Sequence, residues 1–336
     1  MDLETLLTRV YVVVDEWYKE KIAAQKPKVG RRGRLSDSEV LTLAMVGQWR
    51  VGVPWQSERG MVRYMQAHGT RLFPTMIGRS GFNRRVRHLW GVLVRLQQDL
   101  ADWLTASEVV YECVDSLPLS VYSLGEGRRR QRHWLWDARM GYGPEYWFWG
   151  YRLLTSITSQ GVVTGWLMGA ADVQDRWLMQ ALVSARAGRL ECRGPNRGYV
   201  KPKRRIFPPV SPVGPALAAG RMTSRPYLAD QAFNSSAWQQ HWHQAYHATV
   251  IAVPPPLDPA RRAWLPAHHR WMASHRQTIE TVFAILTHAF GLKRLLAHSR
   301  WGLITRLASI MAAFNLAIWL NRQTGAPDLA IASLIT

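Results

Sequence analysis

The chain has 336 residues, 47% of them hydrophobic, so it is long enough for a catalytic core with helical attachments and too apolar for a disordered basic tail. Its 43 Lys and Arg residues oppose 23 Asp and Glu residues, and the formal charge of +20 favours nucleic acid as a partner over charge that serves only solubility. Two cysteines, Cys113 and Cys192, exclude a disulfide framework and a cysteine-only zinc site; both are expected to stay reduced in a cytoplasmic protein.

No segment predicts a membrane span, a secretory signal or a nucleotide site. The most apolar stretch, 307–320, is only about 14 residues long and contains Ser309 and Asn315, so we expect a buried helix there. The first residues are acidic, whereas a signal peptide begins with basic ones. A Gly-x-x-x-x-Gly-Lys phosphate-binding motif is absent from the sequence, so no nucleotide cofactor is expected.

The first 107 residues have the patterns of an all-helical region. The predicted helices cover residues 3–22, 40–49 and 58–66, with a basic linker at 26–34. Ser36 and Glu39 form the Ser-x-x-Glu pattern of a capping box just before the second of these helices.

A long helix is expected to begin at Ser80 and to carry a heptad seam. The seam residues are Phe82, Val86, Leu89, Leu93, Leu96, Leu100 and Trp103. A seam of about three heptads favours packing inside the helical region, with a dimer zipper as the alternative. The opposite face carries Arg84, Arg85 and Arg87, which we interpret as contacts to DNA phosphates, with a solvated charged face as the alternative.

From about residue 108 the pattern predicts an α/β (α+β) region. Strands are expected over 109–114, 147–158, 162–170, 226–230 and 248–253, and helices over 172–187, 235–246, 271–290 and 301–322. Three antiparallel strands followed by alternating helices and strands predict a mixed sheet flanked by helices. The expected domains are 1–107, then 108–295 with a basic Pro/Gly-rich insertion at 188–225, and a C-terminal helix at 296–336 that packs on the core.

Three acidic residues occupy positions that a fold could bring together. Asp115 follows the first strand and precedes Ser-Leu-Pro at 116–118, which is expected to stop that strand; Asp230 ends another strand. Glu280 lies beside the buried stripe of the helix over 271–290. Phosphoryl transfer on DNA by two divalent ions needs such carboxylates, because Mg²⁺ prefers oxygen ligands. The alternatives are a turn or capping role for each aspartate and a solvated helix pair with Arg276 for Glu280.

Two other acids, Asp172 and Asp175, compete with Asp230 for the second position. Asp172 follows a strand and opens a helix, which is typical of an N-cap, whereas Asp230 lies at a strand end as Asp115 does. Glu112 lies three residues before Asp115, so the alternation of a strand points it to the opposite face.

Basic and aromatic residues offer further nucleic-acid contacts. Arg128, Arg129 and Arg130 follow the first strand, and we interpret them as phosphate contacts near the proposed metal site, with a solvated loop as the alternative. The 17 Trp residues are unusual in number; some could stack on unpaired bases, although most are expected in the core.

Two motifs resemble those of bacterial insertion-sequence transposases of the Asp-Asp-Glu (DDE) class. Val-Asp-Ser-Leu-Pro at 114–118 resembles the strand that supplies the first metal ligand in that family, and Arg-Gln-Thr-Ile-Glu-Thr-Val-Phe at 276–283 resembles the helix that supplies its Glu. The family's second motif is usually Gly-Asp-Lys-Gly-Tyr, whereas this chain has Ala-Asp-Gln-Ala-Phe at 229–233. The segments at 35–39 and 82–87 resemble the family's helical DNA-binding region.

The resemblance implies a ribonuclease H-like catalytic domain and metal-dependent DNA transposition. Asp115, Asp230 and Glu280 would be both the catalytic residues and the ligands of two Mg²⁺ ions, for which Mn²⁺ can substitute, and Arg276 would hold Glu280 or a phosphate. The implied partner is double-stranded DNA, as transposon terminal inverted repeats and as target, bound by a homodimer in the bacterial cytoplasm. The alternatives are an inactive or domesticated DNA-binding relative and a structure-specific ribonuclease H-like endonuclease that cuts without joining.

Overall fold

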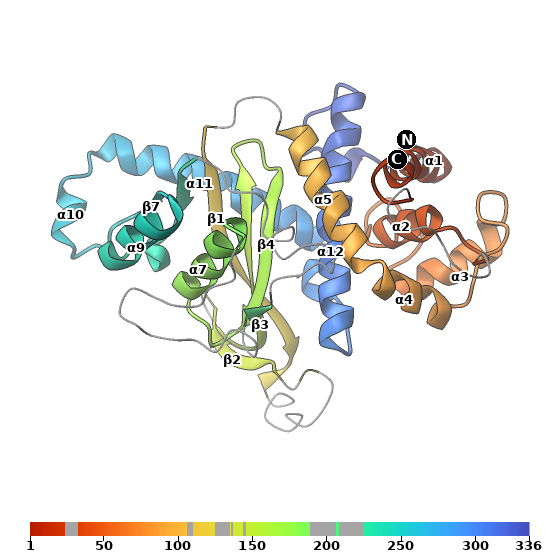
Figure 1. Cartoon of the computed structure of the whole chain (residues 1–336), viewed down its shortest axis with the longest axis horizontal. Helices are drawn as coiled ribbons and strands as arrows, with labels where there is room; N and C mark the ends of the chain where they lie inside the picture. The colour runs from red at the N-terminus through yellow and green to blue at the C-terminus, as the bar shows by residue number, and fades with distance from the viewer. Residues whose placement is uncertain are drawn as a thin grey trace. The chain divides into compact units, whose positions relative to one another are not determined.

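The structure, a computed structural model, describes residues 1–23, 33–105, 110–124, 135, 137–143, 146–188, 206–207 and 225–335. The chain divides into two compact units. Figure 1 labels the helices and strands of both. Unit 1 comprises 1–100 and 285–336, and unit 2 comprises 101–284. This division differs from the expected one, because the C-terminal segment belongs to the same unit as the N-terminal helices and not to the sheet.

Unit 1 is helical, as the periodicity predicts. Its main helices are α1 (Leu3–Lys21), α2 (Asp37–Val46), α3 (Glu58–His68), α4 (Arg79–His88), most of α5 (Trp90–Leu104) and α12 (Arg300–Gln323), with the short 3-10 turns η3 (Leu292–Arg294) and η4 (Ile331–Ser333). The predicted capping box is confirmed: the Glu39 N–H donates to Ser36 Oγ over 3.1 Å, and the Ser36 N–H donates to the Glu39 carboxylate.

The prediction of one long helix from Ser80 is wrong, since α4 and α5 are separate helices that meet at Leu89. The Leu89 N–H donates to the carbonyls of both Arg85 and Val86, which tightens and ends α4. The heptad spacing continues across this junction because the seam residues of α4 and most of those of α5 are buried. Seam residues such as Phe82, 1% exposed, and Leu93, fully buried, pack inside unit 1, so they are not available for a dimer zipper.

Helix α12 supplies much of the core of unit 1 and packs against α2 and α4. It is long and apolar enough to cross a membrane, but 89% of its most apolar window is buried, as in the core helix of a folded protein. The expected buried helix over 307–320 is therefore confirmed. Its internal Asn315 is satisfied by donating from Nδ2 to the Gln97 carbonyl over 3.3 Å.

Unit 2 contains the mixed sheet. Its main strands are β1 (Glu112–Tyr122), β3 (Trp147–Thr158), β4 (Val163–Ala170), β6 (Tyr227–Ala229) and β7 (Val250–Ala252). Two short strands, β2 (Arg139–Tyr142) and β5 (Ile206–Phe207), extend the sheet. The order is β5-β4-β3-β1-β6-β7, and β2 pairs with β3. Strand β3 is antiparallel to β1 and β4, whereas β6 is parallel to β1 and β7. The expected mixed α/β architecture with helices before and around the sheet is confirmed at this level.

Strand β1 does not stop at Pro118 as the sequence suggested, but runs on to Tyr122. Strand β6 pairs with β1 only from Glu112 to Val114, so beyond this point one edge of β1 has no partner strand among the described residues. A proline, which lacks an N–H, is tolerated at such an edge. Asp115 therefore lies within a strand and not at its end.

The helices of unit 2 cover both faces of the sheet. They are α7 (Asp175–Arg186), α9 (Ser236–Tyr246), α10 (Pro259–Arg262) and α11 (Pro266–His288, whose last turn falls in unit 1), with the 3-10 turn η2 (Gln231–Phe233). Val114 of β1 packs in a core cluster with residues of α7 and α9. Its neighbour Cys113 faces the other way, where its Sγ lies 3.3 Å from the His275 carbonyl of α11. Alternate residues of β1 thus face different helices.

Candidate functional site

Asp115 lies within β1, and Asp230 directly follows β6, the strand that runs parallel to β1. The register pairs Val114 of β1 with Ala229, the last residue of β6, and an aspartate follows each of these two residues. Neighbouring strands are about 4.8 Å apart, and Asp230 keeps an extended backbone with φ −79° and ψ −179°. Val114 belongs to the core cluster with α7 and α9, so alternation along β1 points the Asp115 carboxylate to the other face, where Arg276 of α11 lies. The charge of Arg276 also lowers the pKa of Asp230, so Asp230 lies near the same arginine.

The electrostatic environment of this aspartate pair opposes two negative charges. Burial raises the pKa of Asp115 to about 7, and the charge of Asp230 contributes to that rise. Burial also raises the pKa of Asp230. Two backbone donors act in the opposite direction: Ser116 N–H donates to Asp115 Oδ1 over 2.7 Å, and Ala232 N–H donates to Asp230 Oδ1 over 2.8 Å. The net effect is a desolvated site that favours a cation.

Arg276 of α11 partly neutralises the pair. Its Nη2 lies 3.5 Å from Asp115 Oδ2, and its charge lowers the pKa of both aspartates against the effect of burial. The Arg276 Nε is buried and has no hydrogen-bond partner within the described part of the chain. The sequence suggested that Arg276 holds Glu280 or a phosphate; in this structure its ion-pair partner is Asp115.

Asp175, the first residue of α7, is a third carboxylate near the pair. After the larger effect of burial, its charge adds to the raised pKa of both Asp115 and Asp230. Its Oδ2 lies 3.5 Å from Arg152 Nη1, while its Oδ1 is buried without a hydrogen-bond partner among the residues that the structure describes. The sequence identified Asp175 as an acid that competes with Asp230, without a pattern that favoured it. The N-cap role expected of Asp172 is wrong, because Gln174 precedes the first residue of α7 and Asp172 is exposed.

Glu280 is not brought to the aspartate pair. It lies on α11 one turn after Arg276, and its side chain is exposed. Among the described residues, no three His, Cys, Asp or Glu side chains are grouped closely enough to hold a metal ion. Two carboxylates nevertheless fit Mg²⁺, which commonly takes one or two of them and completes its shell with waters and substrate phosphates.

A buried ion pair and a hydrogen bond of the same arginine connect α7, β1 and β6, the elements that position these aspartates. Arg186 of α7 donates from Nη1 to Glu112 Oε2 and to the Tyr227 hydroxyl, each over 2.8 Å. Glu112 and Tyr227 are register partners on β1 and β6, three residues before Asp115 and Asp230 respectively. Both charged side chains are fully buried. The prediction that Glu112 faces away from Asp115 is thus confirmed, and this Arg186 clamp is a feature that the sequence did not reveal.

The arginines proposed to contact DNA have different environments. Arg84 and Arg87 are exposed, as a phosphate contact requires. Arg85 is partly buried and bonds to the Leu35 carbonyl and the Asp37 carboxylate, so its guanidinium stabilises unit 1. The residues 128–130 lie outside the described part of the chain.

Comparisons with protein-family models, with curated proteins and with solved structures found no match. Function is therefore inferred from the side chains and their geometry.

Proposed function

We propose that the chain is a DDE-class DNA transposase, which cleaves the ends of a mobile element and joins them to target DNA on a ribonuclease H-like core. The observation that carries this proposal is the aspartate pair. Asp115 lies in β1 and Asp230 directly follows the neighbouring parallel strand β6, and burial raises the pKa of both. Carboxylates held together at such a cost in free energy are typical of sites that bind a divalent cation.

Each residue of the site has a distinct role in the proposed reaction. Asp115 and Asp230 supply the oxygen ligands, and Glu280, which is exposed on α11 in this structure, completes the set only if the DNA-bound state brings it to the pair. When bound, Mg²⁺ or Mn²⁺ activates the attacking oxygen and stabilises the leaving one. Arg276, whose Nε is already buried and unpartnered in the described structure, orients Asp115 and then a DNA phosphate.

Two properties of the chain support DNA as the substrate. The formal charge of +20 draws a polyanion to the protein. In unit 2, the three antiparallel main strands β1, β3 and β4 precede α7, after which strands and helices alternate. This is the order expected of a ribonuclease H-like core. Joining two element ends calls for a homodimer on DNA, and its interface must lie outside the buried seam of unit 1.

A second candidate function, DNA recognition without cleavage, is favoured by the exposed position of Glu280. An inactive relative would keep the basic surface and lose the metal-dependent reaction. An endonuclease that cuts but does not join is distinguished from a transposase by the strand-transfer step alone.

The test is cleavage and strand transfer with labelled element ends and Mg²⁺. We expect the wild-type protein to nick and join the DNA, and Asp115→Asn and Asp230→Asn to lower the cleavage rate by at least about 100-fold, because each removes a metal ligand. Glu280→Gln is expected to show a loss of the same order.

The matched control is Asp172→Asn, an exposed acid of unit 2 outside the pair, which should stay within about twofold of wild type. Equal cleavage by the wild type and the two aspartate variants would exclude the assigned site. DNA binding without any nicking by the wild type would establish the second candidate instead.

A further inference from the structure

A basic and aromatic depression lies on unit 1, apart from the aspartate pair. Arg84, Arg85, Arg87 and His88 of α4 and Trp301 of α12 line a hollow of about 480 Å³, here called the Trp301 depression. Such a volume falls in the range of small-ligand sites, about 300–1,000 Å³.

Trp301 presents an indole ring to solvent at the edge of this depression. It is 55% exposed, although most large aromatic side chains of unit 1 are buried. Trp90, only 8% exposed, packs behind it with ring centroids 5.1 Å apart and planes inclined by 58°. An exposed ring with a fixed support costs little entropy when it stacks on a ligand.

The lining of the depression favours an anion. Arg84 and Arg87 are exposed guanidinium groups, His88 adds an imidazole, and no acidic side chain is among the described lining residues. The depression also lies at the N-terminal end of α12, which Ser299 caps by accepting from the Gly302 N–H over 3.1 Å. The dipole of a helix of 24 residues adds a preference for negative charge there.

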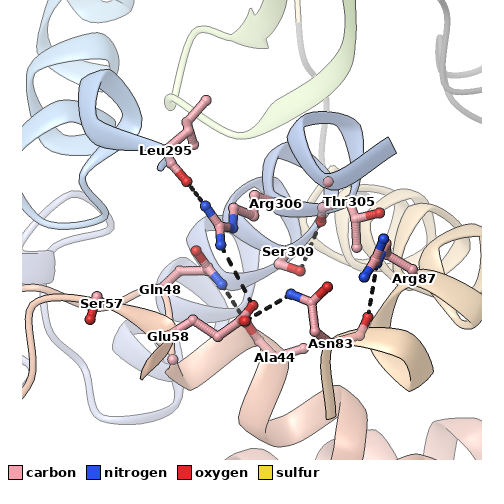
Figure 2. Close-up of polar contacts among 12 residues, drawn as sticks. Ala44, Gln48, Ser57, Glu58, Asn83, Arg87, Leu295, Thr305, Arg306 and Ser309 are labelled. Atoms are coloured by element: carbon pink, nitrogen blue, oxygen red, sulfur yellow. Dashed lines mark hydrogen bonds and ion pairs between the residues drawn. The ribbon is translucent and has the colours of Figure 1, made fainter. Parts of the chain in front are cut away.

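Polar contacts connect α3, α4 and α12 next to Arg87, which also lines the depression (Figure 2). The Asn83 amide donates to Glu58 Oε1 over 2.8 Å, and Arg306 of α12 lies 4.0 Å from the same carboxylate. Arg306 also donates to the Leu295 carbonyl, and Arg87 Nε donates to the Asn83 carbonyl over 3.3 Å. The contacts of Glu58 with Asn83 and Arg306 connect α3, α4 and α12, so they fix the backbone of α4 and α12, from which the arginines and Trp301 project.

We propose that the Trp301 depression binds one unpaired nucleotide of the DNA, with the base stacked on Trp301 and the adjacent phosphate held by Arg84 and Arg87. This inference rests on the proposed function, because it takes DNA as the ligand. A base inside a duplex is stacked on both faces and cannot offer one to the indole, whereas an unpaired base can. The site would recognise a flipped base or a frayed end of the element.

The test uses DNA in which 2-aminopurine, whose fluorescence is quenched by stacking, occupies a single unpaired position. Binding is measured in EDTA, so that it does not depend on cleavage. We expect the wild type to quench the probe and Trp301→Ala to lose the quenching. The variant should bind the unpaired DNA about 5- to 100-fold more weakly while its affinity for fully paired DNA stays within about twofold. Trp301→Phe should keep most of the quenching, since it keeps an aromatic face.

Trp147→Ala is the matched control, because Trp147 is 53% exposed and contacts an aromatic neighbour, Tyr142, in unit 2. It should behave as wild type. Thermal unfolding of Trp301→Ala, matched to that of wild type, separates lost stacking from lost folding. Unchanged quenching by Trp301→Ala, or wild-type binding to the unpaired DNA without quenching, would overturn the stacking site.

Cleavage of the same DNA in Mg²⁺ distinguishes the two proposals. Wild-type protein that cleaves DNA but shows no quenching overturns the Trp301 site alone. Protein that quenches through Trp301 but never cleaves overturns the catalytic proposal and leaves the nucleotide site supported.

Discussion

Asp115 carries the clearest electrostatic signature of the site. Its side chain is 20% exposed, and burial together with the nearby Asp230 raises its pKa to about 7 from an ordinary value near 3.8. The folded protein therefore binds a proton at Asp115 more tightly than the unfolded chain does. The contribution of this group to the free energy of unfolding is fully present below pH 3.8, where Asp115 is protonated, and is lost as the pH rises through about 7.

We expect Asp115→Asn to be more stable than the wild type above pH 7 in EDTA, by at most about 4 kcal/mol, since a shift of one unit corresponds to about 1.4 kcal/mol. The difference should shrink as the pH falls from 7 toward 4. Urea unfolding over this pH range measures it. Asp172→Asn, which lies outside the pair, should keep the pH profile of the wild type, and a wild-type stability without any decline through pH 7 would contradict the assigned cause.

Strand β1 and helix α7 each carry one aspartate of the site, and Asp230 directly follows strand β6; the Arg186 clamp joins these three elements. The Arg186 guanidinium bonds to Glu112 on β1 and to Tyr227 on β6, which are register partners. Its Nη2 also donates to Ser156 Oγ of β3 over 2.6 Å. A one-residue slip of β6 along β1 would break these bonds and turn Asp230 to the opposite face, so the clamp specifies the register on which the pair depends.

We expect Arg186→Met to lower the free energy of unfolding by about 3–5 kcal/mol, because it leaves the Glu112 carboxylate buried without its cation. The double variant Arg186→Met/Glu112→Leu should recover at least about half of that loss, because no unpaired charge remains. Urea unfolding of both variants and of the wild type provides the comparison. Equal destabilisation by the single and double variants would show that the clamp acts through packing and not through charge.

At the scale of the whole molecule, unit 1 is discontinuous in sequence. Its core includes α12, which lies about 200 residues after α5 in the chain and buries side chains such as Leu307, Ile310 and Phe314 completely. The N-terminal helices therefore cannot complete their core by themselves, although the sequence suggested a separate helical region over 1–107.

We expect a fragment of residues 1–104 to show no cooperative unfolding transition, because the surface covered by α12 would be exposed to water. A chain that joins 1–100 to 285–336 through a flexible linker should regain that transition. Circular dichroism during thermal unfolding measures both. Cooperative unfolding of the 1–104 fragment alone would show that α12 is dispensable for this unit.

Local features were predictable because neighbouring residues determine them. Apolar periodicity located α1 and α12, and the Ser36–Glu39 capping box marked the start of α2. Strand-end placement singled out Asp115 and Asp230, although β1 continues beyond Asp115. The heptad pattern could not show the break at Leu89, since the same apolar side persists through both helices.

The sequence alone therefore determined the helical and strand patterns, the basic charge and the two aspartates as candidates, all of which depend on residue type and short-range spacing. Only the tertiary structure decided that these aspartates are neighbours, that Asp175 and Arg276 share their surroundings, and that Glu280 stays exposed. It also decided that α12 belongs with the N-terminal helices. The physical reason is that strand register and burial are set by contacts between residues far apart in the chain, which no local pattern records.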